Sequence, residues 1–162
     1  DWSSDVCSSD LQQALLKAKH FCAYQERCHN EVKEKLYSFG LYKNNVEQIL
    51  SQLIEENFLN EERFAVAFAH GKFTHKQWGK IKIGFYLKQK KVSSYNIKRA
   101  LNAIPDVDYE KTISKIGFLK WKSLQHEQYL NRLVKTKNYL LQKGYEPSLI
   151  ENFLSIMRNK NH

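Results

Sequence analysis

Apolar residues recur at three- and four-residue steps through most of the chain, which is the spacing of amphipathic helices. Val46, Ile49, Leu50 and Leu53 illustrate this pattern. Only two prolines occur in the sequence, and no segment shows the alternation of apolar and polar residues that a half-buried strand requires. The pattern therefore predicts an all-α fold.

Three segments repeat the pattern in register, and they start 51 and 53 residues apart. They read LYSFGLYKNNVEQILSQL from Leu36, LKQKKVSSYNIKRALNAI from Leu87 and LLQKGYEPSLIENFLSIM from Leu140. The five columns that are apolar in every copy are Leu36, Leu87, Leu140; Leu41, Val92, Tyr145; Val46, Ile97, Ile150; Leu50, Leu101, Leu154; and Leu53, Ile104, Met157. A period near 50 residues indicates stacked supersecondary units.

We therefore expect three tandem three-helix repeats, at residues 12–59, 60–105 and 106–162, that form an elongated, curved helical array and share apolar surface with their neighbours. Turn residues support the helix boundaries. Gly40 and Gly144 suit helix ends in the left-handed conformation. Asn44, with Glu three residues later, and Asn60 suit helix starts, and Pro147 suits a first helical turn.

The first eleven residues, DWSSDVCSSDL, show neither a helical nor a strand period. They match the translation of a widely used short-read sequencing adapter, so we expect residues 1–11 to be an artefact and leave them out of the fold prediction. An acidic disordered tail is the alternative. If the adapter interpretation is correct, the native N-terminus is missing and Cys7 is not a cysteine of this protein.

Positive charge is concentrated in the middle repeat. The whole chain has 26 Lys and Arg against 17 Asp and Glu, a formal charge of +9 that rises to +12 without the three aspartates of residues 1–11. Residues 12–62 carry −2, residues 63–105 carry +10 with no acidic residue, and residues 106–162 carry +4. This distribution favours an electropositive surface for a polyanion or an acidic protein, although a solvated face is the simpler alternative.

The segment from Trp78 to Lys91 shows two apolar stripes at 100° per residue. Ile83 and Leu87 should face the core of their own repeat. The second stripe consists of Trp78, Ile81 and Phe85. The simplest expectation is that this stripe packs between repeats, and the alternative is an aromatic patch for a partner. The lysines between the stripes, Lys80 and Lys88 among them, should be exposed.

Residues with catalytic or metal-binding spacing are absent from the sequence. There is no HExxH, no zinc-finger ligand pair, no Gly-rich phosphate loop and no nucleophile elbow. Cys22 and Cys28 are expected to be reduced structural thiols; a redox or metal-binding role is the less favoured alternative. We therefore expect no enzyme and no catalytic, cofactor or metal site, although residues distant in sequence could still form one. The longest apolar run is far below the roughly 20 residues of a membrane span, so we expect a soluble, cytoplasmic protein.

The sequence resembles the RecX family, bacterial regulators of the RecA recombinase, over nearly everything after residue 11. FLNEERFAVAFAHGKF from Phe58 resembles the family signature that leads into its middle repeat, and WGKIKIGFYLKQKKV from Trp78 resembles the segment that follows it. In the latter, Gly79 and Lys80 match a Gly-basic pair. Arg27, Glu31, Leu36 and Gly40 match the first-repeat pattern, whereas Cys28 stands where the family usually has Ser, which puts reciprocal helix capping with Glu31 in doubt.

The resemblance implies a three-repeat, elongated helical protein that lodges in the groove of the RecA–DNA filament and restrains RecA. We expect the protein to be a monomer. DNA within the filament would be a second partner, and free DNA a weaker one. The alternative is a helical-repeat protein that acts on DNA directly without RecA. The candidate contacts for filament or nucleic acid are Arg63, Lys72, Lys76, Trp78, Lys80, Lys82, Lys88, Lys91 and Arg99.

Overall fold

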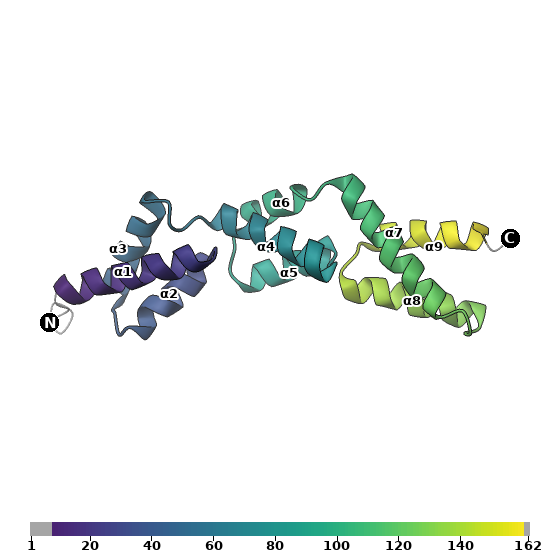
Figure 1. Cartoon of the computed structure of the whole chain (residues 1–162), viewed down its shortest axis with the longest axis horizontal. Helices are drawn as coiled ribbons and strands as arrows, with labels where there is room; N and C mark the ends of the chain where they lie inside the picture. The colour runs from purple at the N-terminus through teal and green to yellow at the C-terminus, as the bar shows by residue number, and fades with distance from the viewer. Residues whose placement is uncertain (1–7, 161–162) are drawn as a thin grey trace. The chain divides into compact units, whose positions relative to one another are not determined.

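The computed structural model describes residues 8–160, which form nine helices and no strand (Figure 1). The helices are α1 (Ser8–Tyr24), α2 (His29–Ser38), α3 (Lys43–Glu55), α4 (Glu61–Lys76), α5 (Lys80–Gln89), α6 (Ser94–Asn102), α7 (Asp106–Ser123), α8 (Tyr129–Lys143) and α9 (Pro147–Lys160). The predicted all-α class and its three-helix repeats are confirmed. The elongated, curved shape of the array stays a prediction.

The register of the repeats is confirmed by burial. Leu36, Leu87 and Leu140 are completely buried in equivalent places. Of the fifteen register positions, thirteen are buried, and the two exceptions are Ile97 and Leu101 of α6. The apolar pattern therefore gives the inward face of the second and third helices of each repeat, and in α6 only Ala100 is buried.

Most of the predicted helix boundaries have the expected local chemistry. Gly144 ends α8 with φ 95°, a conformation that is costly for residues with a Cβ. The Asn60 side-chain Oδ1 accepts the backbone N–H of Arg63 at 2.9 Å at the start of α4, and Pro147 is the first residue of α9. The Asn44 capping box is wrong, because α3 begins at Lys43 and no side chain caps it.

The chain divides into two compact units, and the middle helices contribute to both. Among the described residues, the first unit comprises 8–67 and 87–99, and the second comprises 68–86 and 100–160. The divisions fall within α4, α5 and α6. The helices of the middle repeat are therefore divided between the two units.

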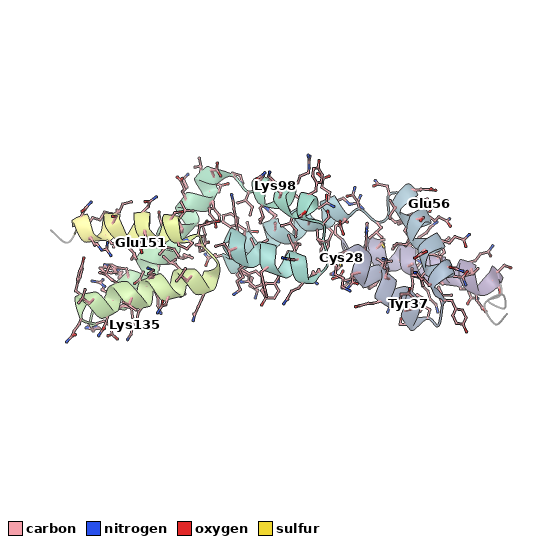
Figure 2. All side chains as sticks on the ribbon, turned by 180° about the vertical axis from the view of Figure 1, so that it is seen from behind. Cys28, Tyr37, Glu56, Lys98, Lys135 and Glu151 are labelled. Atoms are coloured by element: carbon pink, nitrogen blue, oxygen red, sulfur yellow. The ribbon has the colours of Figure 1, made fainter. Side chains whose placement is uncertain are left out.

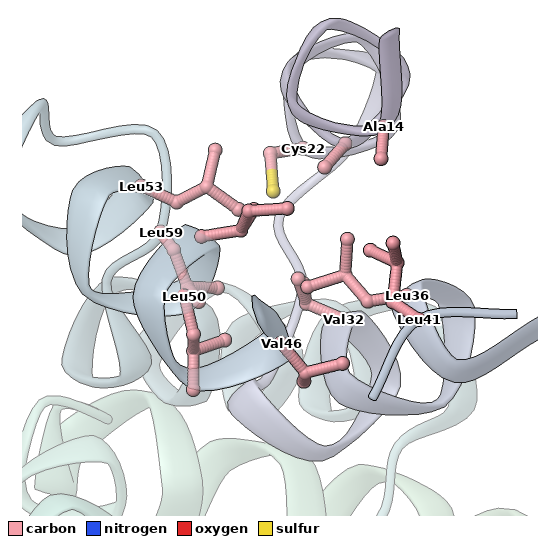
Figure 3. Close-up of a cluster of buried hydrophobic side chains, with 11 residues drawn as sticks. Ala14, Cys22, Val32, Leu36, Leu41, Val46, Leu50, Leu53 and Leu59 are labelled. Atoms are coloured by element: carbon pink, nitrogen blue, oxygen red, sulfur yellow. The ribbon is translucent and has the colours of Figure 1, made fainter. Parts of the chain in front are cut away.

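The core of the first unit lies among α1, α2 and α3, and the Cys22 side chain points into it (Figure 3). Leu11 packs, partly buried, against this cluster, because α1 already begins at Ser8. The helix thus extends four residues further than we expected. The remaining adapter-like residues, 1–7 with Cys7, lie outside the described residues.

Cys22 and Cys28 are both buried free thiols. Burial raises the pKa of each thiol above its ordinary value, so both stay protonated and react slowly. Cys28 occupies the N-cap position of α2, and its backbone N–H donates to Glu31 Oε2 at 3.4 Å. The Glu31 half of the capping arrangement therefore forms even though a thiol replaces the usual hydroxyl.

In the second unit, α7 packs against α8 and α9, and α8 packs against α9. Tyr109, Trp121 and Phe153 are the large aromatic residues of this core, and each is almost completely buried together with Tyr145. The end of α8 is joined to the start of α5 by backbone hydrogen bonds.

Candidate nucleic-acid and partner interface

The positive charge of segment 63–105, which contains no acidic residue, is partly offset by carboxylates from other segments. Carboxylates from other parts of the chain lie within ion-pair distance of four of its ten cations. The pairs are Arg63–Glu26 at 2.6 Å, Lys80–Asp106 at 3.7 Å, Lys90–Glu31 at 3.0 Å and Arg99–Glu62 at 2.6 Å. Such partly exposed pairs contribute little stability, but they offset the positive charge locally.

The two arginines among the candidates make several contacts within their own unit. The Arg63 guanidinium donates to the Asn57 side chain at 3.3 Å and to the Asn57 and Phe58 carbonyls at 3.2 and 3.4 Å. The Arg99 guanidinium donates to Glu62 Oε1 at 2.6 Å and to the Tyr95 hydroxyl at 3.2 Å. Both arginines therefore stabilise the local fold, and their contact with a partner stays a prediction.

Contrary to our expectation, Lys80 is only partly exposed. Its side chain is 22% exposed, and its Nζ lies 4.8 Å from the centroid of the Tyr109 ring. The Lys80 backbone N–H also donates to the Tyr109 hydroxyl at 2.9 Å. Lys88, by contrast, is exposed as predicted.

Six lysines of the segment have no carboxylate within ion-pair distance in residues 8–160. They are Lys72, Lys76 and Lys82 in the second unit and Lys88, Lys91 and Lys98 in the first. Lys98 lies on α6 (Figure 2) and is exposed, although it is not among the candidates taken from the sequence. These six lysines carry the uncompensated charge of the middle repeat.

Lys72, Trp78, Lys82, Phe85 and Tyr86 gather at one place in the second unit, which we call the Trp78 cluster. The Trp78 ring stacks on Tyr86, with centroids 4.8 Å apart and planes at 29°. Phe85 meets Tyr86 edge-on at 5.5 Å. Lys72 Nζ and Lys82 Nζ lie 5.0 and 4.6 Å from the Trp78 ring centroid, which is the range of cation–π attraction.

Two of the three aromatic rings of this cluster, those of Phe85 and Tyr86, are exposed to solvent, whereas Trp78 is half-buried. Phe85 is 56% exposed and Tyr86 is 37% exposed, and nearby in sequence Ile81 is 54% exposed. The expectation that the second stripe packs between repeats is therefore wrong for Ile81 and Phe85. Sequence reasoning missed Tyr86, although its position four residues after Lys82 on one helix face was an available signal.

The start of α5 is fixed to the end of α8 by backbone hydrogen bonds. The Gly79 N–H donates to the Lys143 carbonyl at 2.7 Å, and the Ile81 N–H donates to the Gly144 carbonyl at 3.0 Å. These bonds satisfy N–H groups that have no partner within α5. A Cβ on Gly79 would lie far inside contact distance of the Gly144 backbone and 2.5 Å from the Tyr145 nitrogen. Only glycine permits this approach, which explains Gly79 of the Gly-basic pair.

Two buried tyrosines complete this junction. The Tyr145 hydroxyl donates to the Gln77 carbonyl at 2.8 Å, and the Tyr109 hydroxyl donates to Glu146 Oε2 at 2.7 Å while it accepts the Lys80 N–H. Burial raises the pKa of Tyr109 and of Tyr145 above the ordinary phenol value. Both hydroxyls therefore stay protonated and act as structural donors beside the Trp78 cluster.

Within residues 8–160, no group of three or more His, Cys, Asp or Glu side chains is arranged to hold a metal ion. None of the described helices has both the length and the apolar character needed to cross a bilayer.

The fold and surface define a helical-repeat protein that carries exposed lysine and aromatic side chains. Residues 60–101 match the family model described as RecX, second three-helix domain. The regulatory protein RecX of Oceanobacillus iheyensis is 24% identical over 147 residues, which cover 91% of this chain and 54% of the relative. That of Bacillus cereus is 25% identical over 156 residues, which cover 94% and 57%.

A crystal structure of RecX from Lactobacillus salivarius superposes with a TM-score of 0.87 at 21% identity, and the match covers 94% of this chain and 99% of that one. A second crystal structure of a regulatory protein RecX gives a TM-score of 0.81 at 19% identity, and it covers 90% and 72%. The resemblance to the RecX family is thus confirmed in sequence and in fold. The chain spans a little over half the length of the curated relatives it matches.

Proposed function

We propose that this chain binds the RecA–DNA filament as a monomer in the cytoplasm and lowers RecA recombinase activity, without catalysis of its own. This would make it a negative regulator in DNA recombination, DNA repair and the SOS response. The resemblance to proteins named regulatory protein RecX supports the regulatory role.

The observation that carries the proposal is the set of six lysines without carboxylate partners in the described chain, together with the Trp78 cluster. A RecA filament contains DNA, and cations that meet phosphates release counterions and bind in a salt-dependent way. If about five of the six lysines met duplex phosphates, the slope of log affinity against log salt would be roughly −4 to −5. The same cations would steer association with an acidic protein surface.

The test is RecA strand exchange and DNA-dependent ATP hydrolysis with increasing amounts of the protein. We expect both rates to fall at amounts below one molecule per RecA. The double variant Lys76→Glu with Lys88→Glu should inhibit more weakly at unchanged helicity, because both side chains are exposed. The control is Lys33→Glu with Lys122→Glu, which makes the same charge change on exposed lysines outside the middle repeat and should inhibit like the wild type. Unchanged RecA rates at saturating wild-type protein would contradict the proposal.

Direct action on DNA is the second candidate, and the exposed rings of Phe85 and Tyr86 beside lysines favour it. It requires tight, steeply salt-dependent DNA binding in the absence of RecA and no added effect of RecA on the complex. The filament proposal requires instead that inhibition occurs at protein concentrations too low to occupy free DNA. Titration of free-DNA binding and of RecA inhibition in one buffer separates the two candidates.

A further inference from the structure

We propose that the Trp78 cluster binds single-stranded DNA, with unpaired bases stacked on the Phe85 and Tyr86 rings and neighbouring phosphates held by Lys72 and Lys82. The biological setting of this inference rests on the proposed function, since a recombinase filament is where the protein would meet such a strand. Its chemistry rests on the geometry of the cluster alone.

The rings of the cluster form a continuous aromatic surface. Trp78 stacks on Tyr86, and the Phe85 ring meets Tyr86 edge-on with planes at 87°. Phe85 and Tyr86 keep 56% and 37% of their area exposed. A base that stacks on an exposed aromatic ring contributes about 1–3 kcal/mol whatever its identity. The surface therefore suits a strand of any sequence.

The two lysines are placed to follow the backbone of the same strand. Their Nζ atoms lie 5.0 and 4.6 Å from one ring centroid, so the two atoms are separated by at most the sum of these distances, 9.6 Å. Successive phosphates of one strand rise about 3.4 Å along a helix axis, so two cations no more than 9.6 Å apart suit phosphates of one short stretch of strand. Attraction to the Trp78 ring also restricts the two flexible side chains before binding, which lowers the entropy lost when they meet phosphates.

The composition of the cluster favours a single strand over the other polyanions. In a duplex, each base is covered by its neighbours in the stack, so exposed protein rings gain nothing from it except at an end. Protein interfaces are enriched in arginine and depleted in lysine, whereas both cations of this cluster are lysines, which bind phosphate as point charges. Aromatic rings between lysines are the typical surface for single-stranded nucleic acid.

The junction with α8 gives the cluster a rigid base. Trp78 directly precedes Gly79, whose N–H is bonded to the Lys143 carbonyl, and the Trp78 N–H donates to the Lys72 carbonyl at 3.2 Å. The Lys82 Nζ also lies 3.4 Å from the Gln142 carbonyl. Aromatic rings on a helix whose start is fixed in this way lose little conformational entropy on binding.

The experiment is fluorescence anisotropy of a labelled oligothymidine of about 20 nucleotides and of a matched duplex, with the 162-residue chain and without RecA. The double variant Phe85→Leu with Tyr86→Leu keeps apolar bulk and helix propensity but removes both rings. We expect it to lose about fivefold or more in affinity for the single strand, as the loss of at least one stacked base implies, and less than about threefold for the duplex. Lys72→Gln with Lys82→Gln should weaken both and make the single-strand salt slope shallower by about 1.4.

Two control variants test whether the change in affinity depends on the aromatic rings of the cluster. Phe85→Tyr with Tyr86→Phe retains both rings and should bind like the wild type. Tyr37→Ala removes a tyrosine of α2 that is 47% exposed (Figure 2) and should change nothing. The inference is overturned if the wild type binds no single strand, if the leucine variant loses single strand and duplex equally, or if it binds like the wild type. Because RecA is absent, these outcomes are independent of the RecA rates that test the proposed function.

Discussion

Replacing Gly79 by alanine should separate the start of α5 from the end of α8. The new Cβ would lie 2.5 Å from the Tyr145 nitrogen and closer still to the Gly144 carbonyl group. An ordinary contact of this kind begins near 3.4 Å. The atoms it meets belong to the backbone and not to a flexible side chain, so the two segments must move apart by about 1 Å to relieve the clash.

That movement breaks the bonds that join the two helices. The Gly79–Lys143 and Ile81–Gly144 hydrogen bonds, now 2.7 and 3.0 Å, would both exceed the limit of a useful hydrogen bond. Each lost bond with a buried partner costs about 1–2 kcal/mol. We therefore expect Gly79→Ala to lower the free energy of unfolding of the second unit by about 2–4 kcal/mol.

Gly71→Ala is the matched control, because a Cβ on Gly71 of α4 meets nothing within 4 Å. Alanine in a helix interior is better than glycine by about 0.5–1 kcal/mol, so this variant should be slightly more stable than the wild type. Urea unfolding followed by tryptophan fluorescence reports on the second unit through Trp78 and Trp121. A Gly79→Ala midpoint equal to that of the wild type, or equal losses in the two variants, would refute the close backbone approach.

Three further predictions concern stability. Lys91 has φ 61° at the register position where the other repeats have glycine, so Lys91→Gly should raise the free energy of unfolding by about 0.5–1 kcal/mol in urea. Leu87→Ala should lower it by about 2–5 kcal/mol, because Leu87 is completely buried, while Leu130→Ala, at a position 73% exposed, should change it little. Burial raises the pKa of Cys22 and Cys28, so peptide-level mass spectrometry at pH 8 should find both thiols unalkylated until urea unfolds the chain; rapid alkylation in the native state would contradict their burial.

The buried face of the repeats was predictable because apolar spacing directly encodes the side of a helix that meets the core. Leu36, Leu87 and Leu140 follow this rule without exception. Ile97 and Leu101 do not, because the sequence shows that a face is apolar but not whether another helix covers it. For the same reason, Phe85 was expected to pack against a neighbouring repeat, whereas its side chain is exposed.

Charge was predictable in amount but not in arrangement. The absence of acidic residues from 63–105 is visible in the sequence. The ion-pair partner of Lys90, however, is Glu31, 59 residues away, and that of Arg99 is Glu62, 37 residues away. Pairing across such separations depends on the tertiary fold. Lys80 was misjudged for the same reason, since Tyr109 covers it from another repeat.

Gly79 was recognisable as part of a Gly-basic pair, but the reason for the glycine was not. Its φ is not in the left-handed region that usually marks a required glycine. The requirement comes from the Gly144 backbone, 65 residues further along the chain. Close backbone approach leaves no local signal, so only the structure identifies it.

Electron microscopy of RecA filaments on single-stranded DNA, with and without the protein, tests the central proposal most directly. We expect the wild type to bind along the filaments or to shorten them, and the Lys76→Glu, Lys88→Glu variant to do so only at higher concentration. Filaments of unchanged length that carry no bound protein at saturating concentration would contradict the proposal that this chain regulates RecA through its middle repeat.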